Sequence, residues 1–241
     1  MPLLQRTQVS IPIESMSTIS SGFAEQLRQS SISDWNACVQ HRFVDEIFAG
    51  TLDDAVLRRY LVQDYQFINR FVALLGAAIA SADRFAPRVT LSQFAAMITS
   101  DENTYFLRSF DALGVPEPER LAPSLTPQTQ AFQQLMHEAA QSLNYANCIA
   151  VLAVAEGLYL DWADQPAKQQ LPLPVRFEHA EWITLHANDF FRSFVAWLRS
   201  ELDRVGPALS DAARAEAAGY FQRAVQLERQ FFDHVYVYVY A

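Results

Sequence analysis

Apolar residues recur at spacings of three and four from Ser21 to about residue 236, and proline-rich segments interrupt this pattern. Such spacing places apolar side chains on one face of a helix. The interruptions lie at 114–127, 165–174 and 205–207, and the whole chain has only 7 glycines. The pattern therefore predicts an all-α fold.

The breaks divide the chain into expected helices. Thr51, ahead of two acids, is a typical helix start, and Ser210 begins the last helix in the same way. The last residues, 235–241, alternate like a strand but have no partner, so we expect a helix end or an extended tail. Residues 1–20 are expected to form a tail before a single domain over 21–241. The architecture expected is one bundle of about seven or eight helices, with segments near 22–30, 33–49, 53–83, 88–112, 127–142, 145–164, 176–203 and 209–236.

Composition limits the partners. The 241 residues are 51% hydrophobic, which is enough for one sizeable core. A net charge of -9 without a Lys/Arg cluster argues against nucleic acid or anionic lipid. Two cysteines with no C-x-x-C pair favour a reduced, cytoplasmic setting. The N-terminus has no signal-peptide pattern, and the longest apolar runs are too short, or carry a charge, to span a membrane.

One carboxylate stands in the middle of the long apolar run from Asn147 to Trp162. Glu156 has Leu152 at i-4 and Leu160 at i+4, so it shares their inward face. An ionised carboxylate buried without a partner is very costly. Its position therefore needs an explanation.

Two other acids repeat this arrangement. Asp64 shares its face with apolar and aromatic residues of "RRYLVQDYQFINRF", and Glu228 does so in "YFQRAVQLERQFFDHV". Any one of the three could pair with an arginine or lie at the edge of the core. Three on separate helices, without an obvious inward Arg or Lys, are better explained by a shared polar pocket. Burial there would raise their pKa values and make one a proton donor near neutral pH.

Histidines offer fewer clues. No Glu-x-x-His occurs, so the sequence lacks the usual helical di-metal pattern, and we expect no metal or cofactor. His186 follows Trp182 and precedes Phe190, and it faces inward as either a core residue or a pocket residue. Cys148 lies in an apolar stretch without a nearby base and is interpreted as an inert core thiol.

Four segments in register resemble the TenA (thiaminase II) family, which has the haem-oxygenase-like helical fold. They cover about residues 35–236. They are "HRFVDEIFAGTL…RRYLVQDYQFINRF", "SLNYANCIAVLAVAEGLYLDWA", "EWITLHANDFFRSFVAWLRSELDRV" and "LERQFFDHVY".

The resemblance implies an enzyme of thiamin salvage that cleaves an aminopyrimidine at its exocyclic methylene to give hydroxymethylpyrimidine. It implies that Asp64 binds the amino edge of the pyrimidine and that Glu228 protonates the ring. It also implies a homo-oligomer, either a dimer or a tetramer. Ala155 stands where the family has its nucleophilic cysteine, with Glu156 beside it, so the chain resembles the branch that lacks this cysteine. A narrower substrate than thiamin, an aminomethyl- or formylaminomethyl-pyrimidine, is then expected.

The residue types fit this chemistry. A flat ring stacks between aromatic walls, and a carboxylate such as Asp64 can pair with an amidine-like edge. Without a thiolate, Glu156 would be the base that activates water or would hold the leaving amine. The expected substrate-binding side chains, besides Asp64, are Tyr65, Phe67, Phe132, Tyr159 and His186, with Phe71, Phe221 and Phe231 as further walls.

Two other functions stay open at this point. One is a di-iron or cofactorless oxidase on the same fold, with His179, His186, Glu156 and Glu228 as ligands to test. The other is a relative that kept the pocket and only binds its ligand.

Overall fold

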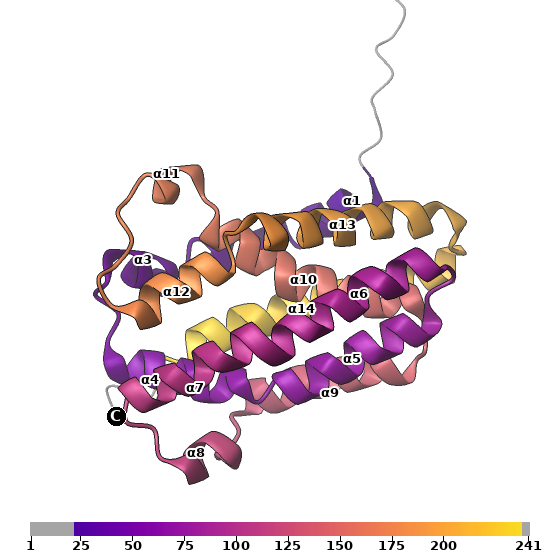
Figure 1. Ribbon diagram of the computed structural model, residues 1–241. Coiled ribbons are helices and arrows are strands. Elements are labelled where there is room, and N and C mark those ends of the chain that lie inside the picture. The colour runs from indigo at the N-terminus through magenta and orange to yellow at the C-terminus, as the bar shows by residue number, and fades with distance from the viewer. Residues whose placement is uncertain (1–21, 238–241) are drawn as a thin grey trace, which may run out of the picture.

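The computed structural model describes residues 22–237, and all elements in this range are helices (Figure 1). The all-α fold is thus confirmed. The expected tail over 1–20 and most of the alternating C-terminal end lie outside the described residues. The first half of the chain forms α1 Phe23–Ser30, α2 Ile32–Val39, α3 Arg42–Ala49, α4 Asp54–Tyr65, α5 Ile68–Ser81, α6 Phe85–Met97, the π-helix η1 Ile98–Glu102 and α7 Asn103–Ala112. The second half forms α8 Glu117–Leu121, α9 Pro127–Gln141, α10 Tyr145–Ala163, α11 Pro166–Gln169, α12 Phe177–Leu185, α13 Asp189–Val205, the 3-10 turn η2 Gly206–Ala208 and α14 Asp211–His234.

The helices are more numerous and shorter than expected, because four of the expected helices are each interrupted. The breaks separate α2 from α3, α4 from α5, and α12 from α13, while the π-helix η1 separates α6 from α7. The α4–α5 break is held by glutamine side chains. Gln63 Oε1 accepts hydrogen bonds from Thr126 N at 3.0 Å and Thr129 Oγ1 at 2.8 Å, and Gln66 Nε2 donates to Arg120 O at 2.9 Å. These bonds tie the break to the segment that leads into α9.

Side-chain caps fix several helix starts. Ser210 caps α14 as predicted, since its hydroxyl accepts from Ala213 N. At α4 the expected cap is wrong by two residues: Asp53, and not Thr51, accepts from Ala55 N at 2.8 Å. Each cap satisfies a backbone N–H that has no partner within the helix.

Helix α10 forms the centre of the bundle. It contacts α14, α13, α5, α2 and α9, and nearly all of its side chains are buried (Figure 1). By length and composition alone it could cross a membrane, but 83% of its most apolar stretch is buried inside the protein, as in a core helix. Gly157 lets Trp35 approach closely, because a Cβ there would lie 3.1 Å from the Trp35 ring. Trp35 Nε1 in turn donates to Asp161 at 3.0 Å.

Buried apolar side chains form one core cluster that runs from Phe23 to Tyr236. Helices far apart in sequence, such as α2 and α14, pack against each other within it. Each buried leucine or phenylalanine contributes about 1.5–3 kcal/mol to the free energy of unfolding. The core therefore holds α4, α10, α12 and α14 in fixed positions around the site described next.

Candidate active site

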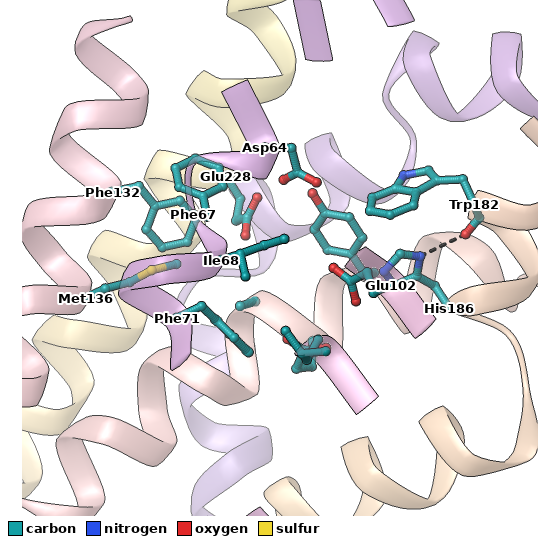
Figure 2. Close-up of a pocket in the computed structure, with 14 residues that line it drawn as sticks. Asp64, Phe67, Ile68, Phe71, Glu102, Phe132, Met136, Trp182, His186 and Glu228 are labelled. Atoms are coloured by element: carbon teal, nitrogen blue, oxygen red, sulfur yellow. Dashed lines mark hydrogen bonds between the residues drawn. The ribbon is translucent and has the colours of Figure 1, made fainter. Parts of the chain in front are cut away.

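A cavity of about 510 Å³, its open mouth included, lies among the central helices (Figure 2). The residues that line the cavity come from α4, α5, η1, α9, α10, α12 and α14, or from positions directly beside these helices. They are Asp64, Phe67, Ile68, Phe71, Ile98, Glu102, Phe132, Met136, Ala155, Glu156, Tyr159, Trp182, His186 and Glu228.

The three acids predicted from sequence all line this cavity. Asp64 comes from the last turn of α4, Glu156 from the middle of α10, and Glu228 from α14. Glu156 is 7% exposed and Glu228 is 3% exposed, while Asp64 is half-buried. The structure thus brings these three carboxyl groups together, and their roles stay predictions.

Burial controls the protonation of these acids. It raises the pKa of Glu156 well above its usual value, and the charges of Glu102, Glu228 and Asp64 raise it further. Burial and then the charge of Asp64 raise the pKa of Glu228. The pKa of Asp64 is raised by burial and by Glu102, against a hydrogen bond from Tyr159 that lowers it. Burial therefore shifts all three carboxyl groups toward their protonated, neutral form.

Two tyrosines connect the acids to the core. The hydroxyl groups of Tyr60 and Tyr159 lie 2.6 Å apart, and both side chains are buried. Burial raises the pKa of both phenols well above the usual value, so both keep their protons. One proton lies between the two oxygens, and the second remains available for a further acceptor such as Asp64. Tyr159 is placed in the cavity as predicted, with Tyr60 behind it.

His186 lies at the end of α12 and lines the opposite side of the cavity from Phe132 and Met136 (Figure 2). Its Nδ1 lies 2.8 Å from the carbonyl oxygen of Trp182, and burial lowers its pKa to about 4. A neutral ring must donate from Nδ1 to that carbonyl, which leaves Nε2 as an acceptor. His186 can therefore accept an N–H from a ligand at neutral pH.

Aromatic rings form the apolar wall. The rings of Phe67 and Phe132 meet edge to face at 5.3 Å, and Phe71 lies one turn further along α5 (Figure 2). Phe231 does not line the cavity but supports this wall from behind, at 5.2 Å from Phe67. This wall can hold a flat heteroaromatic ring.

Tyr65 and Phe221, like Phe231, are expected wall residues that do not line the cavity. Tyr65 is turned away from the cavity: its hydroxyl donates to Asn103 Oδ1 at 3.1 Å, and its ring packs against Phe106 and Phe110. It is adjacent to Asp64 in sequence, so the helix directs the two side chains about 100° apart. Phe221 stacks on Trp35 at 5.9 Å and does not line the cavity either.

Glu102 is the important residue that was not predicted. It lines the cavity at the end of η1, and burial raises its pKa to about 8. The signal was present, since Ile98 at i-4 and Phe106 at i+4 give Glu102 the same apolar neighbours as the other acids. The polar segment around it, "TSDENT", obscured that pattern.

The positions of Ala155 and Cys148 in the structure agree with those expected from the sequence. Ala155 lines the cavity beside Glu156, whereas Cys148 is fully buried two turns earlier on α10. Cys148 Sγ donates to Ala139 O at 3.4 Å, and burial raises its pKa to about 12. Neither Cys38 nor Cys148 is among the lining residues, so covalent attack by a thiolate is not available from this wall.

Comparison with known proteins now places the chain in a family. Residues 29–238 match the model of the TENA/THI-4/PQQC family. The chain belongs to this family. A relative from Halalkalibacterium halodurans, an aminopyrimidine aminohydrolase, is 26% identical over 220 residues, which are 89% of this chain and 95% of that protein.

Solved structures show the same fold. A TenA homologue from P. horikoshii superposes with a TM-score of 0.78 at 17% identity, over 90% of this chain and 99% of the homologue. A domain with a heme oxygenase-like fold from Shewanella denitrificans gives a TM-score of 0.62 at 15% identity, over 91% of this chain and 93% of that one. The haem-oxygenase-like fold expected from the resemblance is thus confirmed.

Three of the four ligands considered for a metal site, Glu156, Glu228 and His186, line the cavity, and His179 does not. Within residues 22–237, no group of three or more His, Cys, Asp or Glu is arranged to hold a metal ion. His179 is buried but is not a lining residue, and both of its ring nitrogens lack a hydrogen-bond partner among the described residues. The described residues thus bring three of the four proposed ligands to the cavity without forming a metal-binding group.

Proposed function

We propose that this chain hydrolyses an aminomethyl- or formylaminomethyl-pyrimidine from thiamin breakdown and releases hydroxymethylpyrimidine for thiamin salvage. The observation that carries the proposal is the meeting of Asp64, Glu156 and Glu228 beside an aromatic wall in one cavity. The curated name of the H. halodurans relative, aminopyrimidine aminohydrolase, supports this choice of substrate class. A cytoplasmic location and assembly into a homo-oligomer stay part of the proposal.

The ring is proposed to lie between the phenylalanine wall and Trp182. Asp64 pairs with the amino edge of the pyrimidine, where N–H groups meet a carboxylate. Glu228 enters the reaction as a carboxylic acid, because burial raises its pKa. It gives its proton to a ring nitrogen, which makes the ring a cation and weakens the bond from the methylene carbon to the amine.

Bond cleavage then needs water and a base. The carbon–nitrogen bond breaks with its electron pair on the leaving nitrogen, and a water oxygen bonds to the methylene carbon. Glu156 accepts the proton that this water loses. Next to a protonated ring its carboxylate form is favoured, although in the empty site burial raises its pKa. The ring proton returns to Glu228, and Glu156 releases the proton of the water to solvent. The nitrogen of an aminomethyl substrate, which entered as an ammonium group, leaves as ammonia.

The test is turnover of both pyrimidines, followed by chromatographic detection of hydroxymethylpyrimidine. We expect Glu228→Gln and Glu156→Gln to lower kcat by about 10²–10⁴-fold, the usual contribution of a general acid or base. Glu216→Gln is the control on the same helix, because Glu216 is exposed and outside the cavity. Wild-type activity in either variant would refute the role of that residue. Binding of the pyrimidines without turnover would favour the ligand-binding alternative.

A further inference from the structure

Glu102 has a carboxyl group without a partner. Within residues 22–237, the carboxyl of Glu102 has no hydrogen bond or ion pair, and burial is the one cause that shifts its pKa. Its position depends on the π-helix Ile98–Glu102, in which the backbone takes up an additional residue per turn. Such segments are rare and occur frequently at functional sites. Ile98 and Glu102, at the two ends of the segment, both face the cavity.

Glu102 lies near the reactive end of the proposed site. Among the charges that act on Glu156, that of Glu102 has the largest effect, and it also acts on Asp64. Figure 2 shows Glu102 on the side of the cavity where Trp182 and His186 lie, away from Phe132 and Met136. Glu102 and Glu156 thus line the same cavity, and the charge of Glu102 is felt at Glu156.

The charge of the lining fits a cation. Four acids line the cavity, and none of the lining residues in the described part of the chain is Lys or Arg. The one histidine stays neutral, since its pKa is lowered to about 4. A cationic ligand would favour the carboxylate forms of these acids, against the burial that raises their pKa values, and would be neutralised by them. An ammonium group has three N–H donors and a positive charge, and can bond to both glutamates and to the free nitrogen of His186.

We propose that Glu102, together with Glu156, binds the exocyclic ammonium group of the substrate and selects a charged aminomethyl-pyrimidine over its neutral formylated form. This inference rests on the proposed function and assigns a substrate-binding role to a residue outside the acid–base pair. Asp64 and the phenylalanine wall hold the ring, which substrate and product share, whereas Glu102 contacts only the group that leaves.

The experiment separates binding of the pyrimidine ring from binding of the exocyclic amine. We would measure KM and kcat for the aminomethyl-pyrimidine, the inhibition constant of the product hydroxymethylpyrimidine, and kcat/KM for the formylated compound. In Glu102→Gln, KM for the amine should rise about 10- to 100-fold, the effect of losing one charge-assisted hydrogen bond. The inhibition constant of the product should stay within about twofold, because the ring contacts are intact. The preference for amine over formylated amine should fall by the same factor as KM rises.

The matched control is Asp101→Asn, which neutralises the exposed acid next in sequence and outside the lining. It should leave all constants unchanged. A parallel rise of KM and of the product inhibition constant in Glu102→Gln would indicate general damage to the cavity and overturn the inference. Unchanged constants in Glu102→Gln would also overturn it, while the proposed function would stand. A wild-type protein that turned over neither pyrimidine would remove the proposed function and this inference with it.

Discussion

Replacing Glu102 by glutamine should change how the stability of the empty protein depends on pH. Burial raises the pKa of Glu102 from 4.5 to about 8. Between these values the folded chain holds a proton that the unfolded chain has released. The contribution of Glu102 to the free energy of unfolding of the wild type therefore falls as pH rises through this window. Glutamine keeps nearly the same shape but does not titrate, so the variant should lose less stability.

The size of the effect follows from the same values. At about 1.36 kcal/mol per pH unit, a rise from 4.5 to about 8 sets an upper limit of about 5 kcal/mol. Glu102 keeps part of its surface open to the cavity, and water there reduces the cost of the charge. We therefore expect the variant to gain about 1–3 kcal/mol over the wild type between pH 5 and pH 8.

The assay is urea unfolding of both proteins at several values from pH 5 to pH 8. His186 titrates with the opposite sign, because its folded pKa of about 4 lies below 6.5, but it is present in both proteins and cancels in the difference. Asp101→Asn, an exposed neighbour, should follow the wild type. If the difference between Glu102→Gln and the wild type did not change with pH, the carboxyl would not be buried in its folded position, and the reasoning would be refuted.

Two further predictions concern packing and the tyrosine pair. Gly76→Ala should raise the free energy of unfolding by about 0.5–1 kcal/mol, since a Cβ there meets nothing within 4 Å and alanine favours the helix. Gly206→Ala should lower it by about 1–3 kcal/mol, because the Cβ would lie 2.6 Å from Phe23; equal thermal melting of the two variants would contradict this. Tyr159→Phe leaves the buried Tyr60 hydroxyl without its partner at 2.6 Å and should cost about 1–3 kcal/mol by urea unfolding. The double change to phenylalanine should recover part of that loss, and a purely additive loss would refute the hydrogen bond.

Helical periodicity was sufficient to predict the fold class and the three inward acids. Asp64, Glu156 and Glu228 each repeat apolar neighbours at i±3 and i±4, a local signal that does not depend on the rest of the fold. Long uninterrupted segments such as α10 and α14 were predicted close to their observed bounds for the same reason. The resemblance to the TenA family then supplied the substrate class that periodicity alone does not give.

The interruptions could not be predicted, because they depend on contacts distant in sequence. The α4–α5 break is stabilised by hydrogen bonds from Gln63 and Gln66 to the segment that leads into α9. The sequence around the break does not reveal these distant partners. Asp64 and Phe67 lie on either side of this break and line the cavity, whereas Tyr65, one helical step from Asp64, packs against α7, so the assignment of Tyr65 was wrong. The π-helix before α7 likewise directs Glu102 into the cavity. It lies in a polar segment whose sequence does not predict a π-helix.

The burial of α10 limits how such a site can change during evolution. A substitution on this helix disturbs neighbours on every side, because Ala155 and Glu156 stand on a segment with hardly any surface of its own. The helix ends near Phe67, Glu102 and His186 are different, since a small change in backbone direction there moves a side chain without repacking a whole helix. In a laboratory evolution experiment that selects for a pyrimidine of another shape, substitutions should therefore occur at those three helix ends. The central helix α10 should stay unchanged.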